Sequence, residues 1–462
     1  MTREPLYRWL VPRVVAPIGA RLGRTAWTTA RDLQTLQWRR PEELENRAVA
    51  RLHALLEHAA HHVPHYRALL AGIDPRTIKS VADLARVPLT AKPELRAGFP
   101  ARTVADNIPE ARRQRMMTSG STGVPLALFW DRSMLPLLGG TYFFLLGWAG
   151  TAVWHPRLVL ASPTYFYESV EAPRPLRRWL DRLVIGRESV SLPADEVTTA
   201  GFRSLVARLT RRGPYFIWGY PGSLANLAAA LAREAIPLAS APRVVVTVAE
   251  TLTAANVENL RRIFGCPVVN YYSSWEVPQI AQTCPDNPDM LHVNGERVVL
   301  RVVREDGIDA PPGEAGRVVL TDLANYAMPF INYLTGDRAV AGGPCACGRG
   351  WPTLARLEGR ESEFIRTLAG REIHGGPLGQ LLTFVIGIIP YVWEYQAVQT
   401  ARDRVRLLVV PTSRYTSQYG ETLRRRVEEF LGPGMTVTLE PVDAIPLEPS
   451  GKRLIIKSLP EA

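Results

Sequence analysis

Short apolar runs alternate with stretches of helical pattern between residues 100 and 340. The runs at 157–161, 215–219, 243–248 and 267–271 are dominated by Val, Leu, Ile and aromatic residues. Such runs are typical of strands buried on both faces, and the stretch 223–233 between two of them has the spacing of a helix. The alternation predicts an α/β fold built of layers.

The chain on either side of this region has its own patterns. Apolar residues recur at helical spacing over 46–70, and residues 294–320 read as strand, turn and strand. Residues 361–462 form a separate α+β block, with a helix near 376–386, strands within 394–410 and a helix over 415–430. A chain of 462 residues is long for one domain, so we expect a large multi-layer α/β domain and a small α+β C-terminal domain.

The formal net charge of +11 is concentrated near the N-terminus. Residues 1–40 hold eight Arg against Glu4 and Asp32, which gives 8 − 2 = +6. A basic excess allows nucleic acid, a membrane surface or an acidic substrate as partner. Here, however, the extra arginines lie mostly near the N-terminus and do not form a stripe along a domain. We expect no nucleic-acid partner. Residues 1–45 either pack on the body or lie on a membrane surface.

Four cysteines are too few for a disulfide scaffold, and arginines interrupt any signal peptide. We therefore expect a cytoplasmic protein, with peripheral contact to the inner face of a membrane as the alternative. The 21 uncharged residues of 134–154 are long enough to span a bilayer. Their glycines and Pro136 favour a buried core helix instead.

The run 118–125 (TSGSTGVP) is the most distinctive local pattern. Six consecutive hydroxyl or glycine residues offer many N–H groups and hydroxyls without bulk, as a polyphosphate requires. The run is not a Walker A loop, because no G-x-x-x-x-G-K-[ST] occurs in the sequence. From the residues alone, a phosphate loop and a flexible polar loop both remain open.

Six segments in order resemble the motifs of adenylate-forming enzymes, the superfamily of acyl-CoA synthetases, luciferases and adenylation domains. They are 118–125, 248–250 (VAE), 272–276 (YSSWE), 335–337 (TGD), 359–360 (GR) and 446–452 (PLEPSGK). The closer resemblance is to the phenylacetate–CoA ligase branch, including CapK proteins. It rests on 61–67 (HHVPHYR), 313–337 and 345–349 (CACGR).

The resemblance implies a domain plan. A basic segment (1–45) precedes a large ATP- and acyl-binding domain (46–358) with a zinc-bearing β region at about 284–347. A hinge (359–363) then leads to a small mobile C-terminal domain (364–462) that carries a catalytic lysine.

The resemblance also implies ATP and Mg²⁺ as cofactors and assigns their ligands. The implied nucleotide-binding residues are Thr118, Ser119, Gly120, Ser121, Thr122, Gly123, Ala249, Glu250, Tyr272, Ser273, Asp337 and Arg360. The loop would hold the phosphates, Tyr272 would stack on adenine and Asp337 would accept bonds from the ribose. Glu276 would bind Mg²⁺, and Lys452 would neutralise charge at the α-phosphate. Singly, Glu276, Asp337 and Arg360 fit ordinary surface roles better, so their assignment rests on the resemblance.

Lys452 stands out without the resemblance. Only four of the 55 basic residues are lysines, namely Lys79, Lys92, Lys452 and Lys457. This chain uses Arg for nearly all of its positive charges. A lysine after a Pro-Ser-Gly turn therefore indicates a site that requires an ammonium group and does not accept a guanidinium. Lys452 is therefore a candidate catalytic residue.

A second constellation consists of potential metal ligands. Cys284 and His292 lie eight residues apart, and Cys345 and Cys347 flank one residue. Three thiolates and one imidazole form an accepted tetrahedral zinc set, and the branch resemblance supports it. The alternative is four unrelated residues. We predict structural Zn²⁺ here and a core role for Cys266.

The acyl pocket is predicted from aromatic residues at the ends of two expected strands and beside Glu276. They are Tyr165, Phe166, Trp218, Tyr220 and Trp275. Ligand sites of α/β folds lie at strand ends, but aromatic residues there also serve as core, so both readings stay open.

The sequence departs from the family pattern at several positions. Ser273 replaces a glycine, Trp275 replaces a threonine and would narrow the acyl pocket, and Asn332 stands where a basic residue is frequent. Ser362 replaces the hinge aspartate, which puts the second half-reaction in more doubt than the first. Val124 stands where the phosphate loop often has a lysine.

The expected function is ATP-dependent activation of an aryl or similar carboxylic acid, followed by acyl transfer to CoA. One alternative transfers the acyl group to an amine or protein thiol. The other is an inactive scaffold of a polysaccharide or membrane assembly. The oligomeric state is left open.

Overall fold

The structure is a computed structural model of the chain. It describes residues 26–118, 126–160, 189–192, 199–210, 214–234, 240–361, 363–382, 386–388, 390–446 and 454–458, with three isolated positions. Residues 119–123, Tyr165, Phe166, Ser362 and Lys452 lie outside these ranges, so what the sequence predicts for them stays a prediction.

The chain divides into two compact units, each built from separate segments. One comprises Val153–Asn270 and Leu357–Ala462, and the other comprises Arg8–Ala152 and Tyr271–Arg356. The two units are called the parallel unit and the antiparallel unit below, after their strands.

The parallel unit contains the buried strands expected from the sequence. Its strands follow the order β6-β5-β3-β4, and the pairs β5–β6, β3–β5 and β3–β4 are all parallel. The bounds are β3 (Arg157–Leu160), β4 (Ser189–Leu192), β5 (Phe216–Gly219) and β6 (Val245–Val248). Every residue of β5 and β6 is buried, which explains why these strands read as unbroken apolar runs.

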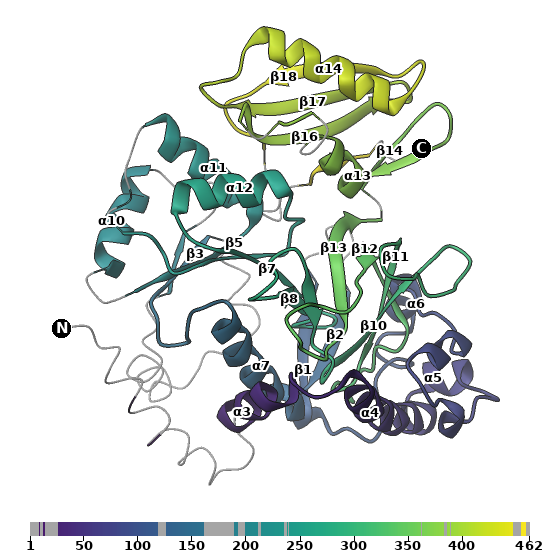
Figure 1. Ribbon diagram of the computed structural model, residues 1–462. Coiled ribbons are helices and arrows are strands. Elements are labelled where there is room, and N and C mark those ends of the chain that lie inside the picture. Colours follow the sequence, from purple (N-terminus) through teal and green to yellow (C-terminus); the bar gives the residue numbers. More distant parts are fainter. Residues whose placement is uncertain are drawn as a thin grey trace. The chain divides into compact units, whose positions relative to one another are not determined.

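Helices α10 (Thr199–Thr210), α11 (Pro221–Arg233) and α12 (Ala254–Phe264) alternate with these strands along the chain (Figure 1). Helix α12 has sequence-encoded ends. The Thr253 hydroxyl accepts a bond from the Asn256 N–H, and Gly265 closes the helix at φ 63°. The strand–helix alternation confirms the predicted α/β class.

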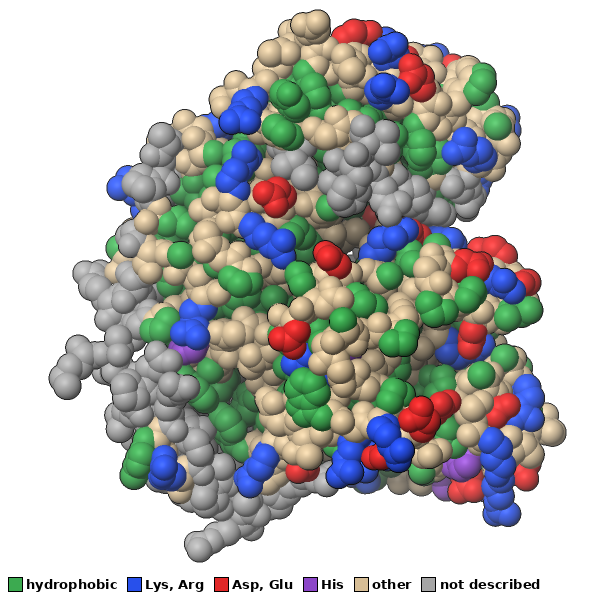
Figure 2. All heavy atoms as spheres, in the orientation of Figure 1, with side chains coloured by type: hydrophobic (Ala, Val, Ile, Leu, Met, Phe, Trp, Pro, Cys, Tyr) green, Lys and Arg blue, Asp and Glu red, His purple; other side chains and the backbone are tan. Residues whose placement is uncertain are grey.

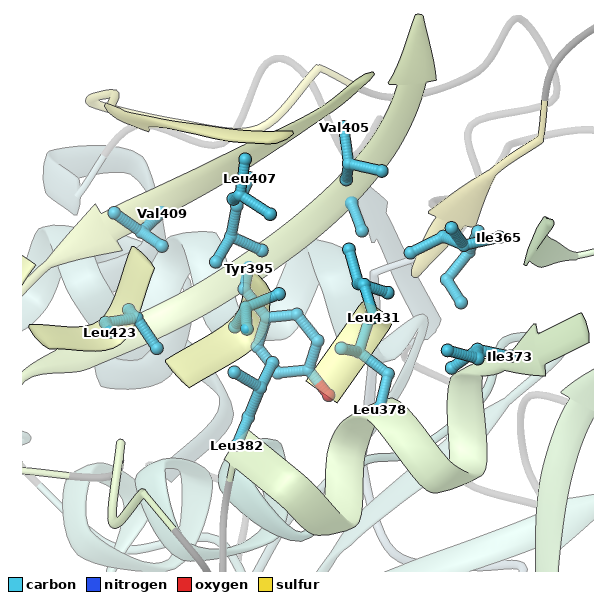
Figure 3. Close-up of a cluster of buried hydrophobic side chains, with 14 of the residues drawn as sticks. Ile365, Ile373, Leu378, Leu382, Tyr395, Val405, Leu407, Val409, Leu423 and Leu431 are labelled. Carbon is cyan, nitrogen blue, oxygen red and sulfur yellow. The ribbon is translucent and has the colours of Figure 1, made fainter. Parts of the chain in front are cut away.

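The C-terminal part of the parallel unit is a four-stranded sheet in the order β18-β17-β16-β19. The elements are β14 (Phe364–Arg366), β15 (Glu372–His374), α13 (Gly375–Gln380), β16 (Val392–Ala401), β17 (Arg404–Pro411), α14 (Ser417–Leu431), β18 (Thr436–Pro441) and β19 (Ile456–Lys457). Leu407 and Val409 of β17 face Leu423 and Leu431 of α14 in one apolar core (Figure 3). This block has the α+β character expected from the sequence.

The antiparallel unit has strands in the order β10-β11-β12-β13-β9-β8. Their bounds are β8 (Ala281–Thr283), β9 (Leu291–Val293), β10 (Val298–Val303), β11 (Ala315–Asp322), β12 (Tyr333–Ala341) and β13 (Thr353–Arg360). The last four residues of β13, from Leu357 on, are assigned to the parallel unit. Strands β10 and β11 form the expected antiparallel pair. Strand β7 (Val268–Tyr272) leads in from the parallel unit, and a separate hairpin joins β1 (Arg113–Met117) to β2 (Ala127–Asp131).

The helices of the antiparallel unit are α3 (Ala26–Leu36), α4 (Pro41–His62), α5 (Pro64–Leu69), α6 (Lys92–Gly98) and α7 (Leu135–Trp148). The helix expected over 46–70 is broken at Val63 because Pro64 disfavours helical backbone in the residue before it. Helix α7 is the expected core helix, 14 residues long. None of the described helices is long and apolar enough to cross a membrane.

Basic and acidic side chains are interspersed on the face drawn in Figure 2. On this face the basic side chains do not form one continuous patch.

Candidate functional site

Glu276 is a buried carboxylate that lies among polar side chains from three other segments. Lys92 Nζ is 3.1 Å from Glu276 Oε1, and the Tyr333 hydroxyl donates to the same oxygen at 3.3 Å. The Lys92 ammonium also lies 3.4 Å from Thr118 Oγ1. Glu276 is only 7% exposed, and a buried charge requires partners of this kind. The predicted Mg²⁺ ligand and the first residue of the predicted phosphate loop therefore meet through Lys92.

Two serines shape the turn that brings Glu276 into this position. Ser273 Oγ accepts a bond from the Gln279 N–H, and Ser274 Oγ accepts one from the Val277 N–H, both at 3.0 Å. These bonds close the chain around Glu276 directly after β7. The serine at 273, where the family has glycine, thus contributes a hydroxyl to the turn.

Lys92 is the first residue of helix α6, and the segment before it is bound to β12. Thr90 donates its N–H to the Asn332 carbonyl at 2.9 Å, and the Leu334 N–H donates to the Thr90 carbonyl at the same distance. The Asn332 amide donates to the carbonyls of Leu84 and Val87, both at 2.7 Å. Asn332 thereby fixes the chain that leads to Lys92 beside Tyr333.

Thr118 closes the base of the loop that joins β1 to β2. Its N–H donates to the Leu126 carbonyl at 3.0 Å, and its Oγ1 accepts from the Leu126 N–H at 2.9 Å. The two ends of the predicted phosphate loop are therefore held together beside Lys92.

Tyr272 and Asp337, predicted to contact adenine and ribose, lie together in the antiparallel unit. The Tyr272 hydroxyl donates to Asp337 Oδ2 at 2.6 Å. The Asp337 N–H donates to Thr335 Oγ1 at 3.0 Å across Gly336, whose φ of 75° suits glycine. The Thr-Gly-Asp segment is thus held within β12, at the point where its pairing with β11 shifts register, and the structure brings together Tyr272 and Asp337 as it does Glu276 and Thr118.

Three further predicted nucleotide residues belong to the parallel unit. Ala249 has a positive φ of 66°, and Glu250 accepts the Gly222 N–H at the start of α11 at 2.8 Å. Glu250, Asn256 and Trp393 line a pocket of this unit. Arg360 ends β13. Their positions relative to Glu276 stay predictions.

Two tryptophans lie beside Glu276. Trp130 Nε1 donates to the Trp275 carbonyl at 2.9 Å, and the ring centroids are 5.9 Å apart. Of the other predicted acyl-pocket residues, Trp218 and Tyr220 are buried at the end of β5 in the parallel unit. Core and pocket roles therefore both remain open for this pair.

The predicted metal ligands form one cluster. The ligand atoms of Cys284, His292, Cys345 and Cys347 all lie within 4.8 Å of one another. His292 Nε2 is 3.2 Å from Cys347 Sγ, and the sulfurs of Cys284 and Cys345 are 3.9 Å apart, too far for a disulfide. The second ring nitrogen of His292 contacts the Trp351 carbonyl at 3.2 Å, which orients the imidazole as a metal ligand requires.

Burial and Arg349 set the charge balance around the cluster. Burial raises the pKa of the Cys284 thiol to about 11 and lowers the pKa of His292, so the imidazole favours its neutral form. Burial also opposes thiolate at Cys347, but hydrogen bonds from the N–H and side chain of Arg349, with those from Cys345 and Cys284, together outweigh it and lower the pKa of Cys347. The donor set matches what zinc binds.

The five histidines of 53–65 make other contacts. His53 contacts the Ile78 carbonyl at 2.6 Å, His58 the Tyr326 carbonyl at 2.9 Å and His62 the carboxylate of Asp106 at 2.9 Å. Among the described residues, the cysteine–histidine cluster is the one group of three or more His, Cys, Asp or Glu side chains placed to share a metal ion.

Lys92 and Tyr333 are site residues that sequence reasoning did not assign. The rarity of lysine was a usable signal for Lys92, since this chain has only four. Tyr333 carries no comparable signal, because its hydroxyl reaches Glu276 only through the folding of β12.

The chain resembles known ligases along nearly all of its length. A family model described as the CapK C-terminal domain matches residues 373–458. A phenylacetate-coenzyme A ligase of Thermus thermophilus is 24% identical over 437 residues, which are 89% of this chain and 95% of that protein. The Escherichia coli protein of the same name is 25% identical, covering 88% of this chain and 92% of its own.

A solved structure of 2-hydroxyisobutyryl-CoA ligase in the postadenylation state shares the fold. Its TM-score is 0.69 at 20% identity, over 91% of each chain. The fold, the ordered motifs and the relatives agree, and together they support the adenylate-forming superfamily, in its phenylacetate–CoA ligase and CapK-like branch.

Proposed function

We propose that this protein is an AMP-forming acid–CoA ligase. The observation that supports this most strongly is the contact of Lys92 with both Glu276 and Thr118. It joins a carboxylate suited to Mg²⁺ to the base of a loop suited to phosphate. Tyr272 and Asp337 add a paired aromatic ring and carboxylate, the side chains that a nucleoside requires.

The first half-reaction joins the acid to ATP. The substrate carboxylate oxygen attacks the α-phosphorus, the bond to the bridging oxygen breaks, and pyrophosphate leaves with the electron pair. Asp337 would bind the ribose hydroxyls, and Glu276 would hold Mg²⁺, which supplies charge compensation for the phosphates. Lys452 is proposed to stabilise the charge that develops at the α-phosphate.

The second half-reaction transfers the acyl group. The CoA thiolate attacks the acyl carbonyl carbon and AMP leaves, so the products are the thioester and AMP. Trp130 and Trp275 beside Glu276 favour a planar or compact acid. The phenylacetate-CoA ligase relatives support CoA as the acceptor, and an amine or protein thiol acceptor is an outcome that the test below distinguishes.

The proposal includes a structural zinc ion held by Cys284, His292, Cys345 and Cys347. A tetrahedral zinc site with Zn–S bonds of 2.3 Å has sulfurs about 3.8 Å apart. The 3.9 Å between the sulfurs of Cys284 and Cys345 fits this value. Elemental analysis should find about one zinc per chain, lost in Cys345→Ser and retained in Cys266→Ser. Folded wild-type protein without metal would contradict the zinc site alone.

An ATP–pyrophosphate exchange assay over a panel of aryl, fatty and short hydroxy acids tests the function. We expect exchange with at least one acid, lost in Glu276→Gln and in Lys452→Ala. Mass spectrometry after addition of CoA, or of an amine, then identifies the acceptor. Binding of ATP without exchange for any acid would contradict the proposal and favour the scaffold alternative.

A further inference from the structure

The proposed reaction gives Lys92 no role, although Lys92 lies between two of the residues assigned to that reaction, Glu276 and Thr118. Its ammonium is 3.1 Å from Glu276 Oε1 and 3.4 Å from Thr118 Oγ1. These partners are 184 and 26 residues away in sequence. The Lys92 side chain is only 22% exposed, so this is not a surface ion pair. One half-buried cation thus lies between the base of the loop and the proposed Mg²⁺ ligand.

The loop itself supplies no positive charge. Residues 118–125 contain neither lysine nor arginine. A triphosphate carries several negative charges, and N–H and hydroxyl dipoles balance them only in part. A phosphate loop of this composition therefore needs a cation from another segment, and Lys92 is adjacent to its first residue.

The frame around Lys92 fixes the ammonium in this position. Thr90 is hydrogen-bonded to β12 on both sides, and Asn332 binds the carbonyls of Leu84 and Val87. Lys79, by contrast, is exposed on a short connection. Lys92 is thus enclosed by neighbouring side chains, and the solvent-exposed Lys79 serves for comparison.

The geometry also leaves capacity for a ligand. An ammonium has three N–H donors, and Glu276 and Thr118 are the two acceptors within reach among the described residues. Both contacts to Glu276, from Lys92 and from Tyr333, are made at Oε1. Oε2 is the oxygen that these two contacts leave for Mg²⁺, so one carboxylate can serve the ammonium and the metal together.

We propose that Lys92 binds the β- and γ-phosphates of ATP and stays bound to pyrophosphate as it leaves. This inference rests on the proposed function, since it assigns the charge partner of the same leaving group. Lys92 would be a catalytic residue distinct from Lys452: the first acts on pyrophosphate and the second on the α-phosphate.

Calorimetric binding of MgATP and of AMP to Lys92→Met provides the test, with Lys79→Met as the matched control. AMP lacks the β- and γ-phosphates. Loss of one charge-assisted bond should therefore lower the affinity for MgATP by about 10- to 100-fold and leave the affinity for AMP unchanged. Unchanged AMP affinity also shows that the variant is folded. Lys92→Arg retains the charge and should recover most of the MgATP affinity.

Two results would overturn the inference. One is MgATP affinity in Lys92→Met equal to that of the wild type, and the other is an equal loss for MgATP and AMP. The exchange assay separates this inference from the function. Wild-type exchange with unchanged MgATP affinity in Lys92→Met overturns only the role of Lys92. Absent exchange with a selective loss of MgATP affinity overturns only the ligase function. A wild-type protein that binds neither nucleotide overturns both.

Discussion

Asn332 holds a backbone conformation that few side chains accept. Its φ is 45°, and its amide donates to the carbonyls of Leu84 and Val87. Its side-chain oxygen accepts from Arg301 at 3.3 Å, and the residue is fully buried. Asparagine tolerates this left-handed region better than most residues, so both backbone and side chain select it here.

Replacing Asn332 should therefore cost stability in two ways. Asn332→Ala leaves two buried carbonyls unpaired, which should lower the free energy of unfolding by about 2–4 kcal/mol. Asn332→Gly loses the same bonds but accepts the positive φ, so it should be about 1 kcal/mol less destabilising than alanine. Urea unfolding of both variants measures the difference. Equal losses would show that backbone strain contributes nothing.

The same residue illustrates what a single sequence can reveal. The motif around Asp337 indicated that Asn332 departs from the family pattern, but not what the departure does. The structure shows a buried amide that binds carbonyls some 245 residues away. Glu276, Asp337 and Thr118 were found because each is part of a local motif. Lys92 and Tyr333 reach Glu276 only through tertiary structure, which no local pattern encodes.

At the scale of elements, the hydrophobic periodicity of the sequence predicted which helices and strands exist better than it predicted where they begin and end. The expected strand at 215–219 is β5 (Phe216–Gly219), and the expected helix at 223–233 is α11 (Pro221–Arg233). Buried runs and helical spacing determine these elements locally. The order β6-β5-β3-β4 could not be predicted, because strand order depends on which faces the connecting helices cover.

The apolar core of the C-terminal sheet contains a hydroxyl without a partner. Tyr395 of β16 is 5% exposed, and its hydroxyl lies among Leu378 and Leu382 with no hydrogen bond (Figure 3). A Cβ atom on Gly379 would lie 3.0 Å from this oxygen. Burial also raises the pKa of Tyr395, as expected for a phenol that cannot be solvated.

Tyr395→Phe should therefore stabilise the protein. Removing a buried, unpaired hydroxyl should raise the free energy of unfolding by about 1 kcal/mol. Tyr66→Phe is the matched control, because the Tyr66 hydroxyl is also buried but donates to the Pro329 carbonyl and accepts from the Ile331 N–H. That change should lower the free energy of unfolding by about 1–3 kcal/mol. Urea unfolding with the same sign for both variants would contradict the argument.

At the scale of the whole molecule, the cysteine–histidine cluster connects segments that are distant in sequence. It joins the ends of β8 and β9 to the turn between β12 and β13. Arg349, two residues after Cys347, extends this connection to the N-terminal region. Its Nε donates to Gln37 Oε1 at 2.7 Å, and its guanidinium lies 4.5 Å from the centroid of the Trp38 ring. The residues after helix α3 are therefore bound to the turn that carries two of the proposed zinc ligands.

Loss of the metal should consequently release the N-terminal region before the rest unfolds. Cys345→Ser, or chelation of the wild type, removes the constraint that aligns Arg349 with Gln37 and Trp38. We expect faster proteolytic cleavage within residues 26–40 and a change in tryptophan fluorescence, because Trp38 and Trp148 both flank Arg349. Arg349→Ala should reproduce the faster cleavage while retaining zinc, whereas Cys266→Ser should change neither property. If zinc-free protein were cleaved at the wild-type rate while Arg349→Ala was cleaved faster, Arg349 would hold the N-terminal region without help from the metal, and the proposed coupling would be wrong.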